Sequence, residues 1–153
     1  MVEIFQNQMK KLMNELSKEQ LSKIHYGSVS NFLQYFNQLK GDSLKQEILI
    51  LLENYFEKIK ELNYELNKDE SQMLYDNYLM KVGTYYNSEL RFQVYMQPKW
   101  ALFIGLNVDV VLLIFGLLKK VYYIPIVTIL FCGYFIYLKM KYGRQNKLYG
   151  YGY

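Results

Sequence analysis

The chain has 153 residues, of which 52% are apolar, and this length suits one ordinary domain. Its single cysteine and single histidine, Cys132 and His25, exclude an internal disulfide and the usual clusters of zinc or iron–sulfur ligands. The formal net charge is +4, but residues 1–99 carry 12 basic and 13 acidic side chains, whereas residues 100–153 carry 6 basic and 1 acidic. The positive charge therefore flanks the apolar C-terminal third, which indicates a membrane rather than a nucleic acid.

Residues 1–97 are predicted to form a cytoplasmic helical bundle. Apolar residues at three- and four-residue steps predict an amphipathic helix over residues 4–24, interrupted near Ser17. A short second helix over residues 29–39 follows a break that contains His25, which we expect to be a capping or surface residue. The longest apolar stripe, over residues 44–62, predicts a third helix.

The third helix has a charged face opposite its apolar stripe. Glu57, Glu61 and Glu65 follow each other at four-residue steps, and such a row of like charges is mildly destabilising unless cations neutralise it. The simplest interpretation is a solvated helix face. The alternatives are a docking surface for a basic partner and a cation vestibule beneath a pore.

The last cytoplasmic helix is predicted over residues 70–97, where Pro98 breaks it. Its apolar and aromatic residues spread too widely for one helix–helix seam, so part of this surface is expected to contact a ligand, another subunit or lipid headgroups. Ordinary core and interface packing is the alternative. The tyrosines proposed for such a contact are Tyr75, Tyr78, Tyr85 and Tyr86.

Two apolar runs, residues 100–118 and 121–138, predict a transmembrane helical hairpin within residues 98–138. As helices they would be about 27–29 Å long, close to the ~30 Å hydrocarbon core of a bilayer. Asp109 opposes insertion by about 2.5–3.5 kcal/mol, but the 13 Leu, Ile, Val and Phe residues of its run contribute roughly 4–8 kcal/mol in favour. More basic residues flank the hairpin's outer ends than its turn, which places both termini in the cytoplasm and the short turn outside.

Aromatic and basic residues mark the expected membrane interfaces, because amphipathic rings and long cationic side chains prefer the headgroup layer. The expected interface residues are Trp100, Lys119, Lys120, Tyr122, Tyr123, Lys139, Lys141 and Arg144. The last three belong to a segment, residues 139–153, that is expected to be a basic, Tyr- and Gly-rich cytoplasmic tail attracted to anionic lipid.

Polar residues inside the two runs are the candidate functional residues. Asp109 is the midpoint of the first run, Asn107 points about 200° away from it, and Thr128 is expected at a similar depth on the second run. Either Thr128 hydrogen-bonds to Asp109 and holds the helices together, or Asp109 from several copies forms a cation-selective ring. The small residues expected to permit close helix packing are Gly105, Gly116 and Cys132.

The expected fold class is thus an all-α membrane protein, with a helical bundle followed by a transmembrane hairpin. This layout resembles the small membrane effectors of bacterial anti-phage defence, without sharing a sequence motif with them. The resemblance implies a homo-oligomeric pore in the bacterial inner membrane, gated by a cytoplasmic messenger nucleotide or protein. No catalytic motif, metal-ligand cluster or cofactor-binding motif occurs, so enzymatic activity and a cofactor are not expected. The alternative function is a non-conducting, membrane-anchored adaptor or immunity protein that binds a protein partner through residues 1–97.

Overall fold

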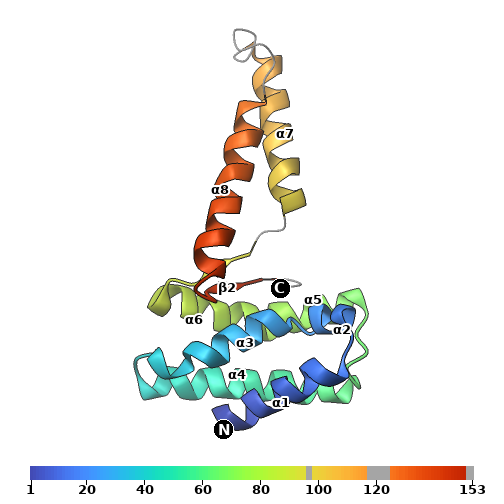
Figure 1. The fold of residues 1–153 in the computed structure, drawn as a ribbon, viewed down its shortest axis with the longest axis vertical. Helices are drawn as coiled ribbons and strands as arrows, with labels where there is room; N and C mark the ends of the chain where they lie inside the picture. Colours follow the sequence, from blue (N-terminus) through green and yellow to red (C-terminus); the bar gives the residue numbers. More distant parts are fainter. Residues whose placement is uncertain (96–97, 117–124, 151–153) are drawn as a thin grey trace. The chain divides into compact units, whose positions relative to one another are not determined.

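The computed structural model describes residues 1–95, 98–116 and 125–150, and most of them are helical (Figure 1). The chain forms two compact units. Unit 1 contains Met1–Tyr95 together with the residues from Asn146 onward, and unit 2 contains Met96–Gln145. The mostly helical fold agrees with the all-α expectation.

Unit 1 begins with three helices, α1 (Val2–Glu15), α2 (Lys18–Lys23) and α3 (Tyr26–Tyr35), and a short 3-10 turn, η1 (Phe36–Gln38). The predicted interruption near Ser17 is confirmed. Ser17 adopts an extended conformation, and its side chain accepts a hydrogen bond from the Gln20 backbone N–H at 3.2 Å. The Gln20 side chain accepts one from the Ser17 N–H at 3.0 Å, so a reciprocal cap starts a new helix here.

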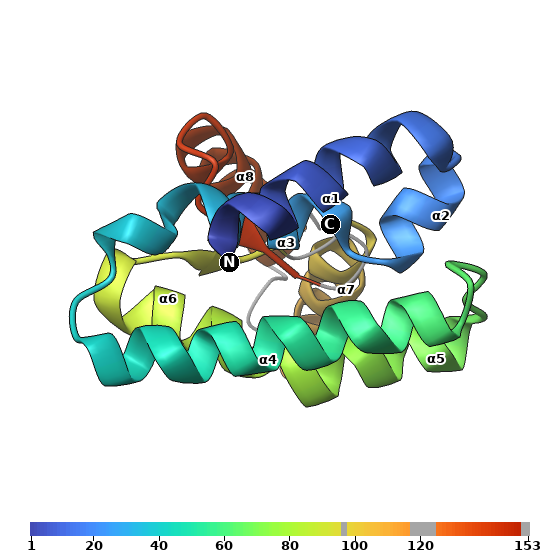
Figure 2. The ribbon, with the colours of Figure 1, turned by 90° about the horizontal axis from the view of Figure 1, so that it is seen from below.

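The second half of unit 1 contains α4 (Asp42–Glu61), α5 (Lys68–Leu74), the π-helical turn η2 (Tyr75–Leu79) and α6 (Met80–Leu90). In Figure 2, α1 and α3 lie on one side of this unit, with α4, α5 and α6 on the other. The two sides meet in a core that includes the fully buried Phe32, Leu52 and Tyr86. This core is built from the apolar stripes that the sequence predicts.

The predicted helix over residues 70–97 ends early, which corrects the expected boundary. Arg91 adopts a left-handed conformation with φ of 58°, and this conformation stops α6 at Leu90. The next residues form a short strand, β1 (Gln93–Val94), in place of the last helical turns. Pro98 is the first residue of the following helix, where its missing N–H costs little.

The predicted tail over residues 139–153 is also corrected. Its first part continues a helix of unit 2, whereas Leu148–Tyr149 form β2, which pairs with β1 in parallel within unit 1. Leu148 and Tyr149 are buried, with 2% and 4% of their surfaces exposed. The Asn31 side chain donates to the Leu148 carbonyl at 2.8 Å, and Ser28 Oγ lies 3.1 Å from the Gly150 nitrogen that donates to it. The segment is therefore part of the folded unit.

Tyr149 completes an aromatic cluster in unit 1. Its ring lies 5.6 Å from the Phe32 ring, which also contacts the rings of Tyr86 and Phe92. A Cβ atom on Gly83 would lie 2.1 Å from the Tyr149 ring, so this position of α6 accommodates only glycine while Tyr149 is in place. The placement of β2 thus depends on the close contact between the Tyr149 ring and Gly83, which no local sequence pattern indicates.

Unit 2 is a helical hairpin of α7 (Pro98–Ile114) and α8 (Ile126–Gly143), which pack along each other (Figure 1). The second helix starts and ends five residues later than the predicted run, 121–138. Among the described helices, only Ile126–Gly143 is both long and apolar enough to cross a membrane, and Trp100–Ile114 is a shorter apolar helix. The expectation of two full spans is therefore not confirmed.

Candidate functional site

The polar centre of unit 2 is a cluster formed by Asp109, Val127 and Thr128, which we call the Asp109 cluster. Asp109 is 3% exposed. Its Oδ1 accepts a hydrogen bond from the Val127 N–H at 3.0 Å, and its Oδ2 accepts from the Thr128 N–H at 2.8 Å and from Thr128 Oγ1 at 2.6 Å. The predicted hydrogen bond between Thr128 and Asp109 is thus present.

The position of the Asp109 cluster follows from how α8 begins. The first N–H groups of a helix have no partner within the helix, and they carry the positive end of its dipole. The residue before α8 is Pro125, which provides no side-chain cap. The Asp109 carboxylate on α7 supplies the missing acceptors from the other helix. The geometry is that of a helix cap contributed by a tertiary neighbour.

Small residues bring α7 and α8 close together beside this cluster. Ala101, Gly105 and Asp109, at four-residue steps, are the buried residues of α7 among those described. A Cβ atom on Gly105 would lie 2.7 Å from the Thr128 Cα, so glycine is required for this backbone approach. Gly105 therefore has the close-packing position that the sequence predicts.

The other two predicted close-packing residues differ from Gly105. Gly116 lies beyond the end of α7 and has a φ of 72°, so it ends the helix instead of packing on a helix face. This corrects its predicted role. Cys132 is half-buried on α8, one helical turn beyond Thr128.

Asn107 does not join the Asp109 cluster. Its side chain is exposed, and its amide donates a hydrogen bond at 2.7 Å to the Phe103 carbonyl of the same helix. The two polar residues of the first run therefore have different surroundings, as their angular separation predicts. Of these two residues, Asp109 hydrogen-bonds to α8, whereas Asn107 hydrogen-bonds within α7.

The outward faces of the hairpin are apolar. A soluble helix pair would expose polar side chains and bury these residues. The exposed apolar side chains of α7 include Leu102, Phe103, Ile104, Leu106, Val108, Val110, Val111 and Ile114, and those of α8 include Ile129, Leu130, Phe131 and Ile136. The hairpin thus buries small and polar residues at its seam and presents large apolar ones to its surroundings.

The predicted interface residues are only partly within the described chain. Trp100 is 53% exposed near the start of α7. Lys139, Lys141 and Arg144 are exposed at the end of α8, and the Lys141 ammonium lies 5.7 Å from the Tyr137 ring centroid. Lys119, Lys120, Tyr122 and Tyr123 lie outside the described residues.

The tyrosines predicted to contact a ligand or subunit divide into two pairs. Tyr75 and Tyr86 are buried, and the Tyr86 hydroxyl donates to the Phe32 carbonyl at 2.6 Å. These two are core residues, which agrees with ordinary core packing and not with a ligand or subunit contact. Tyr78 and Tyr85 are half-buried, and the Tyr85 hydroxyl donates to the Glu47 carboxylate. The four side chains therefore do not form one exposed tyrosine surface.

His25 occupies the N-cap position of α3 without a side-chain cap hydrogen bond, and it is buried, which corrects the expectation of a surface residue. It has a left-handed backbone with φ of 52°, and its Nε2 lies 2.9 Å from the Ser71 carbonyl oxygen. Ser71 Oγ also donates to the Lys23 carbonyl at 2.7 Å. Burial lowers the pKa of His25 below its ordinary value, against the opposing effects of the Ser71 hydrogen bond and the Asp76 charge.

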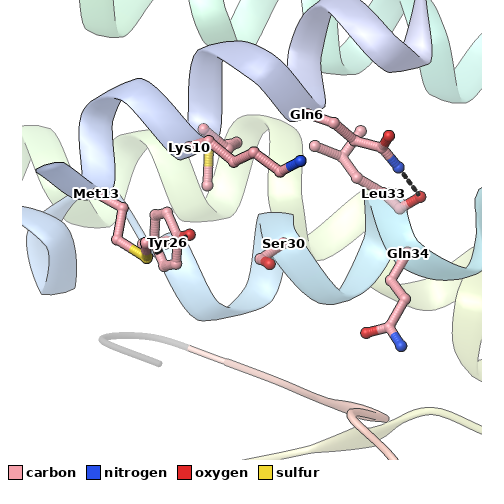
Figure 3. A pocket seen from close by; sticks show the side chains of 8 residues that line it. Gln6, Lys10, Met13, Tyr26, Ser30, Leu33 and Gln34 are labelled. Atoms are coloured by element: carbon pink, nitrogen blue, oxygen red, sulfur yellow. Dashed lines mark hydrogen bonds between the residues drawn. The ribbon is translucent and has the colours of Figure 1, made fainter.

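A groove between α1 and α3 was not predicted from the sequence (Figure 3). Its volume of about 500 Å³ is within the usual range of binding sites. The residues lining it are Gln6, Met9, Lys10, Met13, Tyr26, Ser30, Leu33 and Gln34. The two helices contribute these residues from separate segments, so no local motif could reveal the groove.

No protein-family model, curated protein or solved structure was found to match this chain. Its function is therefore inferred from its own residues.

Proposed function

We propose that the chain is a membrane-anchored protein, in which the α7–α8 hairpin holds the helical unit 1 at the cytoplasmic face of a bilayer. The observation that carries this proposal is the inverted burial of unit 2, where small and polar residues are inside and large apolar residues are outside. Lipid is the surrounding that such a surface fits. The basic residues Lys139, Lys141 and Arg144 favour the cytoplasmic side for the end of α8.

In this proposal the Asp109 cluster is structural. Both carboxylate oxygens of Asp109 already accept hydrogen bonds from the start of α8. In hydrocarbon, unpaired N–H groups at a helix start would cost several kcal/mol, so a cap from the neighbouring helix keeps the hairpin closed. Such an anchor needs no water path, and unit 1 then acts as an adaptor or immunity module for a protein partner.

An ion-conducting oligomer is the second candidate function. The observation that favours it is Asn107, a polar side chain on the exposed face of an otherwise apolar stretch of α7. A neighbouring hairpin would cover this amide, because polar side chains commonly form hydrogen bonds between membrane helices. For Asp109 to line a pore, the hydrogen bonds to Val127 and Thr128 would have to open. A gated pore of the kind implied by the defence-effector layout would belong to this candidate.

The test compares Asp109→Asn and Asp109→Leu with the wild type in detergent and in liposomes. Asn retains one acceptor oxygen and Leu retains none. Thermal unfolding, followed by Trp100 fluorescence, should therefore show the order wild type, Asn variant, Leu variant. Three interhelical hydrogen bonds of ~0.6–2 kcal/mol each predict a loss of about 2–6 kcal/mol for the Leu variant. Asn107→Leu is the matched control, because it removes a polar group whose bond stays within one helix, and it should have little effect.

Ion flux through liposomes distinguishes the two candidate functions. An anchor should conduct no ions, with or without host-cell extract as a source of activator. Flux in the wild type whose selectivity changes in Asp109→Asn, combined with unchanged stability of Asp109→Leu, would establish the pore and refute the structural role of Asp109.

A further inference from the structure

The groove between α1 and α3 has one charged side chain, Lys10, beside the half-exposed Met13 (Figure 3). Within the described part of the chain, Lys10 has no ion-pair partner, although its neighbour Lys11 pairs with Glu15 at 3.8 Å. The Gln6 amide lies one turn before Lys10 and donates one hydrogen bond, to the Leu33 carbonyl at 3.2 Å. A side-chain amide has two N–H donors, so one remains among the residues that the structure describes. The groove therefore offers an apolar contact, a cation and an amide donor in a row.

A complementary row lies on the outer face of α4. Ile50 is 57% exposed, although the residues on the opposite face of this helix are buried. Glu53 and Glu57 follow it on the same face, and both are exposed. Among the described residues, neither carboxylate forms an ion pair. This row therefore offers an apolar side chain followed by two acceptors.

The two rows have the same spacing. Met13, Lys10 and Gln6 are separated by steps of three and four residues along α1, read from its C-terminal end. Ile50, Glu53 and Glu57 are separated by steps of three and four along α4, read from its N-terminal end. Residues three and four apart lie on one helix face, so the rows match when the helices run antiparallel.

We propose that the groove between α1 and α3 of one copy binds the outer face of α4 of a second copy, with α4 antiparallel to α1. Ile50 then packs beside Met13, Glu53 pairs with Lys10, and Glu57 accepts from the free N–H of Gln6. The apolar contact supplies affinity, and the charged pair fixes the register.

This contact is heterologous, because two different surfaces meet, and each copy carries one of each. It involves unit 1 alone, so it does not depend on the proposed membrane anchoring, and either proposal can fail without the other. It also gives Glu53 and Glu57 of α4 specific partners on the second copy, Lys10 and Gln6, instead of solvent alone.

Crosslinking of full-length protein in detergent tests the contact. Cys132→Ser removes the native thiol, after which Met13→Cys copies are mixed with Ile50→Cys copies and treated with a short bismaleimide. The mixture should give a crosslinked dimer, whereas each variant alone should not, because its partner surface has no thiol. Met80→Cys replaces Ile50→Cys as the matched control, since Met80 is similarly exposed, at 48%, but lies on α6.

Charge reversal then tests the register. Lys10→Glu on the Met13→Cys copy should lower the crosslinking yield about three- to tenfold, and Glu53→Lys on the Ile50→Cys copy should restore it. Lys11→Glu is the control on α1 outside the groove and should have little effect. A monomeric mass by analytical ultracentrifugation without crosslinking, equal yields with Met80→Cys, or reversal variants without effect would each overturn the proposal.

Discussion

At the scale of single residues, His25 shows how a side chain can be central to the fold without taking part in a binding site. It is buried between α2 and α5, where the Ser71 carbonyl accepts its Nε2–H hydrogen bond. The sequence places it two residues before Gly27 and three before Ser28, a segment that favours a turn and therefore predicts exposure. Its burial depends on Ser71, a residue 46 positions away. Contacts of this range have no local signal.

The buried His25 predicts a stability that depends on pH. Its folded-state pKa lies below the ordinary value of 6.5, so the unfolded chain takes up a proton near pH 6.5 that the folded chain does not. The contribution of neutral His25 to the free energy of unfolding should therefore be fully present above this pH. It should decrease as the pH falls below 6.5, until the folded-state pKa is reached. The loss cannot exceed about 1.4 kcal/mol per pH unit for one group.

Urea unfolding of the full chain in detergent, from about pH 7.5 to about pH 5.5, measures this effect. His25→Asn is the comparison, because asparagine tolerates the left-handed backbone and does not titrate there. The variant should be less stable at neutral pH but should lose less stability on acidification. Parallel pH curves for the two proteins would contradict a role for His25.

At the scale of elements, local signals predicted that most of the chain is helical, but they predicted neither all of the helix boundaries nor the strand pair. The apolar stripes, the interruption near Ser17 and the hydrogen bond between Asp109 and Thr128 all follow from spacing in the sequence. The strands β1 and β2 have two residues each, too few for an alternating pattern. The end of α6 falls at Arg91, a residue type that does not usually mark a helix end. Tertiary packing determines these features.

The close fit of Tyr149 on Gly83 predicts that β2 is essential for unit 1. Tyr149→Ala removes a buried aromatic ring, and changes of this kind cost about 3–5 kcal/mol. Gly83→Ala should act in the same direction, because its Cβ would overlap the ring at 2.1 Å and displace β2. Urea unfolding gives the loss in stability, and limited proteolysis shows whether residues after Asn146 become accessible.

Gly133→Ala is a suitable control, since a Cβ atom there meets nothing within 4 Å. It should leave unit 1 unchanged. If β2 were bound only loosely, Tyr149→Ala, Gly83→Ala and Gly133→Ala would have equal stability and equal protease resistance.

At the scale of the whole molecule, the hairpin is an insertion within unit 1. The chain leaves unit 1 after Tyr95, next to β1, and returns at Asn146, just before β2. Because β1 and β2 are paired, both connections belong to one folded unit. If the hairpin enters a membrane, its two outer ends must therefore lie on the same side. This reason for the predicted topology is independent of the distribution of positive charge.

Single cysteines in a Cys132→Ser background test this topology with a membrane-impermeant maleimide on intact, right-side-out vesicles. Gln93→Cys and Asn146→Cys should both be protected and should react only after the vesicles are opened. Lys119→Cys should react in intact vesicles if the turn is outside. Labelling of Gln93→Cys and Asn146→Cys from opposite sides of the membrane would contradict a single folded unit 1 that lies on one side.

The pairing of β2 with β1 also sets an order of events during synthesis. The ribosome makes β2 after the hairpin, yet Tyr149 belongs to the core of a unit that begins with α1. The core formed by the first 95 residues therefore cannot be completed by Tyr149 until both apolar helices have been synthesised. Under the proposed membrane anchoring, a nascent chain whose hairpin reaches a bilayer before β2 emerges would complete the core of unit 1 only after it has reached the membrane. Unit 1 would then mature where it is used.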